Sequence, residues 1–220
     1  MDKTKTNMTT DIQASCSRCG AIQTLPFHAG INVAEEPELK ARVRDGSLFL
    51  WECPRCGARN LLSGQTLYHD PEGRLMIWLL PEGTLAEDQV RAVESQMEGL
   101  EGYTLRRVPD VGGLIEKVHI HEAGLDDVVM ELCKHVTRLE LADTEKKPEL
   151  LEAPFRFFRM DGPDNRITFS YPREGRMFLA ETGFRTYEDC RGIVQRNPAM
   201  HPEEGRFARV DAAWIGRFFR

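Results

Sequence analysis

The sequence predicts an α+β protein: a zinc-ribbon-like knuckle domain with an inserted helix, a β-hairpin and further helices, followed by a small β-meander and helix unit. Three observations predict this class. Two Cys-x-x-Cys pairs are separated by 33 residues, apolar runs of strand length alternate with helical stripes, and the composition changes after residue 150. We expect a disordered lead over residues 1–11, the knuckle domain over residues 12–145 and a C-terminal α+β domain over residues 151–220.

The composition excludes several classes of protein. A chain with 41% hydrophobic and 29% charged residues is typical of globular proteins and not of disordered ones. Its longest apolar run, Leu75–Leu80, is far shorter than the ~20 residues that cross a bilayer. The first eleven residues are polar and lack the apolar core of a signal peptide. We therefore expect a cytoplasmic protein without a membrane partner, and the net charge of −6 argues against general coating of nucleic acid.

Four of the six cysteines form the two pairs, and each pair is followed directly by glycine. Because thiols stay reduced in the cytoplasm, a four-thiolate metal site is a better explanation than disulfide bonds. Two such turns facing each other can hold Zn²⁺ in a closed tetrahedron, which is a structural site. The alternatives are two unrelated reduced pairs or a redox dithiol. The predicted zinc ligands are Cys16, Cys19, Cys53 and Cys56.

Several segments together carry a resemblance to a known family: the two cysteine pairs, Ile31–Ala34, Pro37–Lys40, Leu67–Pro71 and Ala123–Leu132. They are similar to the CpXC protein family. The likeness extends over about residues 12–140 and departs from the family pattern at Ser17, where the family has proline. It implies a bacterial or archaeal protein with paired cysteine knuckles, supports zinc as the metal and implies no particular reaction.

The knuckle domain is expected to alternate strands with helices. Residues 70–73 read Asp-Pro-Glu-Gly between two apolar runs, which predicts a type I hairpin turn. Thr84 with Glu87 resembles a capping box, and the helix that follows would place Ala86, Val90, Val93 and Met97 on one face. A short helix is expected from about Glu35 to Asp45. The expected strands are residues 22–33, 48–52, 66–69, 74–80 and 103–108.

A longer amphipathic helix is predicted towards the end of this domain. Asp126 and Asp127 suit its first turn, and Lys134 suits its later part, because the helix dipole favours that arrangement of charge. Its apolar stripe consists of Leu125, Val128, Val129, Leu132, Val136 and Leu139. Residues 143–148 form a charged linker.

Residues 151–220 differ in composition from the rest of the chain. They contain 12 of the 18 aromatic residues and 12 of the 29 basic residues, all of them arginine, and their net charge is +2 against −8 for residues 1–150. Three alternating segments separated by turns predict an antiparallel meander. The expected strands are 155–160, 166–171 and 177–181, and the expected helices are 187–195 and 211–219.

Other candidate sites have simpler explanations. His119 and His121 would share a face on a strand, but the surrounding apolar spacing indicates a helix with Asp110 as a cap, on which residues two apart diverge. A second metal site there is the weaker interpretation. His69 and Asp70 lie at the hairpin turn, where turn chemistry explains the aspartate better than catalysis does.

The two remaining cysteines are not assigned a function. Cys133 falls on or beside the apolar stripe, where a buried, inert thiol is expected. Cys190 falls in the predicted helix 187–195 between Asp189 and Arg191, where we expect partial exposure, and a reactive role is the weaker interpretation.

The four cysteines would fill every coordination position of a zinc ion, and we recognise no set of catalytic residues in the sequence. We therefore predict a non-enzymatic interaction or adaptor module with another protein as its partner. One alternative is an enzyme with an active site between the two domains. Another is nucleic-acid binding through the arginines and aromatic residues of 155–219, which the acidic chain as a whole disfavours.

Overall fold

The computed structural model describes residues 7–95 and 100–219, and the predicted α+β class is confirmed. The chain divides into two compact units. The first consists of Met1–Ile115 with Glu204–Ala208, and the second of Glu116–Glu203 with Arg209–Arg220. The charged segment 143–148, expected to link two domains, lies inside the second unit. Among the described residues, no helix combines the length and the apolar character that crossing a membrane requires.

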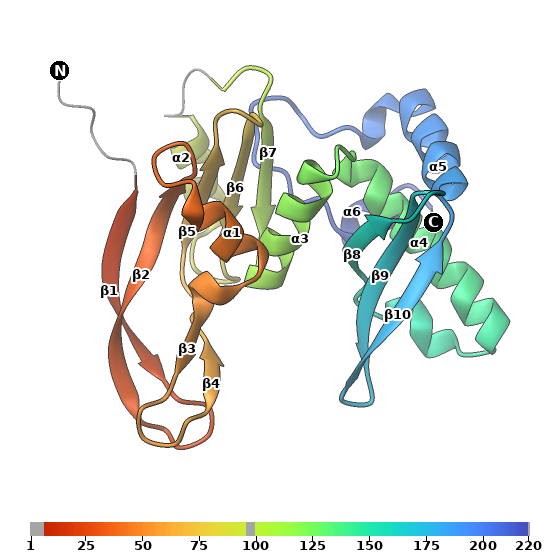
Figure 1. Cartoon of the computed structure of the whole chain (residues 1–220). Coiled ribbons are helices and arrows are strands. Elements are labelled where there is room, and N and C mark those ends of the chain that lie inside the picture. Colours follow the sequence, from red (N-terminus) through yellow and green to blue (C-terminus); the bar gives the residue numbers. More distant parts are fainter. Residues whose placement is uncertain (1–6, 96–99, 220) are drawn as a thin grey trace. The chain divides into compact units, whose positions relative to one another are not determined.

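The first unit is built on a five-stranded sheet in the order β1-β2-β5-β6-β7 (Figure 1). Neighbouring strands are antiparallel except for the β2–β5 and β6–β7 pairs, which are parallel. The predicted hairpin of β5 and β6 is confirmed. The strands are β1 (Met8–Ser15), β2 (Ile22–Asn32), β5 (Thr66–Asp70), β6 (Leu75–Leu79) and β7 (Thr104–Val108).

Strand β1 corrects the expected disordered lead. It begins at Met8, and Thr10 and Asp11 pair with Phe27 and Pro26 of β2. The side chains of Met8–Asp11 are exposed, so the apolar pattern by which a strand is recognised is missing, and backbone pairing alone orders the segment. The remainder of that expected lead, residues 1–6, lies outside the described residues.

A second, two-stranded ribbon follows the short helix α1 (Glu38–Arg44), which buries Leu39 and Val43. The 3₁₀ helix η1 (Ser47–Phe49) leads into β3 (Leu50–Glu52), which pairs with β4 (Arg59–Leu61). In Figure 1 the turn of this ribbon lies beside the turn that joins β1 to β2. The two cysteine pairs occupy these two turns.

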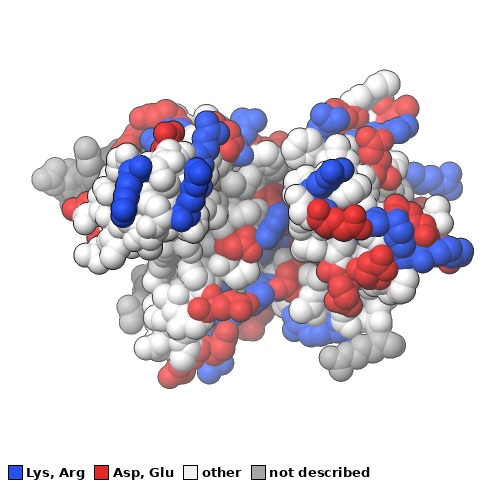
Figure 2. Space-filling model, turned by 90° about the horizontal axis from the view of Figure 1, so that it is seen from below, with Lys and Arg blue, Asp and Glu red and all other residues white. Residues whose placement is uncertain are grey.

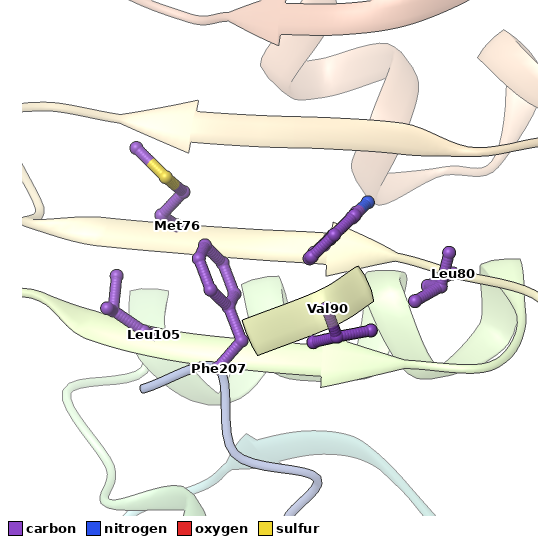
Figure 3. Packing of buried hydrophobic residues seen from close by; sticks show 6 residues of the cluster. Met76, Leu80, Val90, Leu105 and Phe207 are labelled. Carbon is purple, nitrogen blue, oxygen red and sulfur yellow. The ribbon is translucent and has the colours of Figure 1, made fainter. Parts of the chain in front are cut away.

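Strand β6, which lies between β5 and β7, is buried on both faces, and this explains its unbroken apolar run. On one face, Met76 and Trp78 pack with Val90 of α2 (Glu87–Glu94), Leu105 of β7 and the distant Phe207 (Figure 3). The Phe207 ring meets Trp78 edge-on, with 5.7 Å between ring centroids. The segment Glu204–Ala208 is anchored at the sheet edge because Arg107 N–H donates to the Ala208 carbonyl at 3.0 Å.

The predicted capping box of α2 is wrong. The Thr84 hydroxyl donates to the Pro81 carbonyl, and the Gln89 side chain instead accepts the N–H of Ala86. The helix therefore begins two residues later than the Thr-x-x-Glu pattern suggested, with Ala86 and not Thr84 at the N-cap position. Val90 is buried as expected, Val93 is 37% exposed, and Met97 lies outside the described residues.

The second unit combines helices with a three-stranded antiparallel sheet in the order β10-β9-β8, as the predicted meander requires. Asp126 caps the long helix α4 by accepting the N–H groups of Val128 and Val129, and the expected stripe ends early because Leu139 is 46% exposed. Helix α3 begins in the first unit and ends in the second. The elements are α3 (Val111–Glu122), α4 (Asp127–Glu145), η2 (Pro148–Glu152), β8 (Arg156–Asp161), β9 (Arg166–Arg173), β10 (Arg176–Thr182), α5 (Phe184–Arg196), η3 (Pro198–Met200) and α6 (Ala212–Gly216).

Candidate metal centre

The two cysteine turns have the same backbone structure. In the first turn, Gly20 N–H donates to the Cys16 carbonyl at 2.9 Å, and in the second, Gly57 N–H donates to the Cys53 carbonyl at 2.8 Å. Both glycines have positive φ, 69° and 66°, in the left-handed region that side chains disfavour. No neighbouring atom crowds Gly20. Backbone conformation therefore explains the glycine after each pair.

The four predicted ligands lie together. Their sulfur atoms are all within 4.8 Å of one another, with 3.6 Å between Cys16 and Cys56 and 3.7 Å between Cys19 and Cys53. A tetrahedral metal with bonds of about 2.3 Å to sulfur requires about 3.8 Å between sulfurs. Each turn contributes two thiols, so the four cysteines could hold one metal ion and link the β1–β2 turn to the β3–β4 turn.

Asn60 of β4 joins the two turns through its side chain. Its carbonyl oxygen accepts the Ser17 N–H at 2.9 Å and the Ser17 hydroxyl at 2.8 Å. Its amide donates to the Ala58 carbonyl at 2.8 Å and points at the Cys16 sulfur at 3.7 Å. The side chain is buried, so these bonds form away from solvent. Ser17, where the family pattern has proline, thus supplies a link that proline could not, because proline has neither an N–H nor a hydroxyl.

Two thiols of the cluster have pKa values that are shifted in opposite directions. Burial favours the neutral Cys16 thiol, but the backbone N–H groups of Cys19 and Arg18 outweigh it and lower its pKa to about 6. The Ala58 backbone N–H favours the Cys56 thiolate, yet burial and the neighbouring thiols raise the pKa of Cys56 to about 12. A bound cation removes this conflict because it stabilises every thiolate at once.

Comparison with known proteins places the chain in a family. The family model for the CpXC protein matches residues 14–134, which is more than half of the chain. The chain belongs to the CpXC family. The match includes both cysteine turns and ends within α4, so it supports the resemblance read from the sequence. No curated protein and no solved structure shows significant similarity to this chain.

The histidine candidates of this CpXC protein do not join a metal site. His119 and His121 lie on helix α3, and the only group of three or more potential ligands found in residues 7–95 and 100–219 is the cysteine cluster. The side chains of His69 and Asp70 have different partners. The His69 ring nitrogen lies 3.2 Å from the Tyr103 hydroxyl, whereas Asp70 accepts the Gly73 N–H at the hairpin turn.

The arginines and aromatic residues of the C-terminal part are largely engaged within this CpXC protein. Arg159, Arg166 and Arg173 form ion pairs with carboxylates at 2.8–3.3 Å. In the face drawn in Figure 2, basic and acidic side chains adjoin one another over much of the surface. The buried aromatic residues of this part are Phe155, Phe157, Phe169, Tyr171, Tyr187 and Phe207.

Sequence analysis missed a buried ion network in the second unit. Lys134, assigned to the helix dipole, instead reaches Glu131 at 2.5 Å and Glu116 at 2.8 Å, while Lys117 reaches Asp127 at 2.7 Å. A lysine and a glutamate three residues apart beside an apolar stripe could have signalled it. Its members, all less than 10% exposed, are Glu116, Lys117, Asp127, Glu131 and Lys134.

The two unassigned cysteines are also neighbours. Cys133 of α4 is buried as expected, but Cys190 of α5 is 2% exposed, which corrects the expected partial exposure. The two thiols lie near enough to shift each other's pKa, which is raised for Cys133 and lowered for Cys190. Nothing in the sequence indicated this proximity, because the two residues belong to separate helices.

Proposed function

We propose that Cys16, Cys19, Cys53 and Cys56 bind a structural zinc ion, and that the chain is a non-enzymatic protein-interaction module of the cytoplasm. The observation that carries the zinc proposal is the spacing of the four sulfur atoms, which suits tetrahedral coordination. Four protein ligands leave no coordination position for substrate or water. The metal would hold the two cysteine turns together and take no direct part in a reaction.

An exposed apolar surface near the cysteine turns supports a protein partner. Leu50 and Leu61 stand directly opposite each other on β3 and β4 and are 47% and 55% exposed. Ile22, next to the first turn, is 65% exposed. Exposed apolar side chains on an ordered two-stranded ribbon contribute little to the core and suit contact with another protein. We name the pair Leu50 and Leu61 the ribbon surface.

The zinc proposal is tested by metal content. Mass spectrometry of the native protein should find one zinc and no stoichiometric iron, because both metals accept four thiolates. Cys56→Ser should lower the zinc content and the thermal midpoint, whereas Cys133→Ser should leave the zinc content unchanged. A metal-free protein with an unchanged thermal midpoint would contradict the proposal.

The interaction proposal is tested by substitutions on the ribbon surface. Leu50→Glu with Leu61→Glu should abolish recovery of a specific partner from the native host while retaining zinc. Leu139→Glu, at a leucine of similar exposure in the second unit, is the matched control and should retain the partner. The interaction proposal would be contradicted if both variants lost the partner equally, or if the variant with Leu50→Glu and Leu61→Glu still bound it.

The alternatives stay predictions. Nucleic-acid binding predicts an oligonucleotide affinity that falls steeply with salt, and no measurable binding at low salt would remove it. An enzyme would be indicated by a ligand bound between ionisable side chains away from the cysteines.

A further inference from the structure

We propose that the first unit carries a groove for an extended segment of another protein, and that Glu204–Ala208 occupies this groove as a displaceable internal ligand. We call this segment the strap. The groove consists of the outer edge of β7 and the apolar pocket beside Trp78. Its ligand is a protein segment in which a basic residue comes directly before a bulky apolar one. The elements of the groove contribute nothing to the cysteine cluster or the ribbon surface, so this proposal is independent of both.

The strap binds the sheet through its backbone. Strand β7 is the last strand of the five-stranded sheet, and the strap lies along its outer edge. The Arg107 N–H donates to the Ala208 carbonyl at 3.0 Å, and the Ala208 N–H donates to the Leu105 carbonyl at 3.3 Å. The strap therefore pairs with β7 as a short parallel strand does. Extended peptides add to exposed sheet edges by the same backbone bonds, which require no particular side chain.

One side chain of the strap supplies its apolar contact. Phe207 is 4% exposed, whereas the three residues before it are exposed. Its ring points from the strap onto β6, where it meets Trp78 edge-on and packs with Met76, Val90 and Leu105 (Figure 3). A pocket that takes a single ring selects a bulky apolar residue at that position of the ligand.

A buried carboxylate selects the residue before the apolar one. Glu94 of α2 is 9% exposed, and its two oxygens accept the Phe207 N–H at 2.8 Å and a guanidinium N–H of Arg206 at 3.1 Å. Both partners belong to the strap. A buried carboxylate that loses its partners is costly. An empty groove therefore favours a ligand that restores both bonds, which an extended segment with a cationic residue at this position does.

The strap is held by few contacts, so it can be displaced. Its neighbours Glu203 and Arg209 belong to the second unit, and only the strap itself docks on the first. Helix α2 buries only Val90 and Glu94. Glu94 bonds to the strap and Val90 packs in the same cluster as Phe207, so α2 and the strap hold each other in place. Segments with few buried side chains open locally at a fraction of the free energy of global unfolding.

A docked strap competes with any ligand from solution. Binding to the unaltered chain is weakened because the groove is empty in only a fraction of the molecules. A ligand with the sequence of the strap should therefore bind more tightly once the strap of the chain itself docks poorly. This difference in affinity is specific to an internal ligand, because a surface that is always free would bind the peptide equally in both cases.

The test uses the full chain with its metal bound and a fluorescent peptide of the strap sequence, Gly-Arg-Phe-Ala-Arg-Val. Fluorescence anisotropy measures the affinity of this peptide for the unaltered chain and for Phe207→Ala. The variant should bind at least about tenfold more tightly, and bound peptide should raise its thermal midpoint. A peptide with alanine in place of phenylalanine should not bind, and one with glutamate in place of the first arginine should bind more weakly.

Phe219→Ala is the matched control, since it removes an exposed ring and should bind the peptide as the unaltered chain does. If Phe207→Ala does not fold, Phe207→Leu replaces it, because leucine keeps an apolar side chain in the pocket. Equal affinity in the unaltered chain and the folded variant, or no binding to the variant, would overturn the proposal. So would a dimer of the unaltered chain that Phe207→Ala converts to a monomer, since the ligand would then be the strap of a second copy.

A second measurement needs no variant. Hydrogen exchange followed by NMR on the unaltered chain should show the Arg107 and Ala208 amides exchanging at least about tenfold faster than the hydrogen-bonded amides of β6. The strap would then open while the sheet stays folded. Equal rates would mean that the strap separates only when the first unit unfolds, and this result would also overturn the proposal.

Discussion

Two regions of the molecule concentrate buried ionisable groups and stabilise them in opposite ways. The cysteine cluster brings together four thiols whose sulfurs lie within 4.8 Å, and it contains no positive side chain among its members. The ion network of the second unit interleaves acids and lysines, so that Lys134 lies between Glu116 and Glu131 at 2.8 Å and 2.5 Å. A cation for the cluster would have to come from outside the chain, whereas the network supplies its own.

This difference decides how each region responds to change. If the cluster binds a metal as we propose, removal of that metal would break the link between the two cysteine turns. Removal of one lysine leaves buried carboxylates with too little compensating positive charge, which costs more than the intact pairs contributed. The cysteine cluster should therefore respond to chelators, and the ion network should respond to single substitutions.

The largest expected effect is that of metal removal. A chelator should abolish hydrogen-exchange protection in both cysteine turns and leave α4 protected, because structural zinc sites contribute on the order of 10 kcal/mol of binding free energy to folding. Exchange measured by mass spectrometry with and without chelator checks this. Uniform loss of protection throughout the chain would show that the two regions are not independent.

Lys134→Met should cause the largest loss of stability among the substitutions in the second unit. It leaves Glu116 and Glu131 buried without this ammonium group and should lower the free energy of unfolding by about 3–5 kcal/mol. Chemical denaturation followed by circular dichroism measures the change. Lys147→Met, which breaks the more exposed ion pair with Glu145 at 3.2 Å, is the control and should cost about 0–1 kcal/mol.

Phe207→Ala should destabilise the first unit by about 3–5 kcal/mol, because it leaves a cavity against Trp78. Tryptophan fluorescence during denaturation reports the loss. The zinc content should stay at that of the native protein, since the ring packs on the sheet and not among the cysteines. Phe219→Ala, at an exposed ring, is the control.

As the pH falls, the cysteine cluster and the ion network should respond at different pH values. The pKa of buried Glu116 is lowered, because Lys134, Lys117 and the Phe157 N–H together outweigh the effect of burial. A lowered pKa means stability that is fully present above the ordinary value of 4.5 and lost as the pH falls through the lowered value. Proton competition for thiolates releases metal at higher pH. A pH titration of zinc content and of unfolding should show metal loss first, and the reverse order would contradict the comparison.

The smallest expected effect is that of Asn60→Ala. Loss of its bonds to Ser17 should lower the free energy of unfolding by about 1–3 kcal/mol and weaken zinc binding without abolishing it. Competition with a chromogenic chelator measures the metal affinity. Asn197→Ala, at an exposed asparagine that donates to the Ile193 carbonyl, should leave the affinity unchanged.

The sequence by itself determined the α+β class, the β5–β6 hairpin, the meander and the four cysteines of the cluster. These features rest on local signals: the period of apolar residues, turn chemistry at residues 70–73 and the glycine after each cysteine pair. The same local signals misplaced the start of α2 and missed the beginning of β1, where neighbouring turn bonds and strand pairing outweigh the pattern.

Only the tertiary structure decided which distant groups meet. Phe207 completes the core of a sheet whose strands end at Val108, and Lys134 joins Glu116 across two helices. Neither of these contacts has a periodic or spacing signal, because each depends on the packing of elements far apart in the chain. A charged residue or thiol is recognised in sequence by its neighbours along the chain, whereas its pKa and its partner are set by neighbours in space.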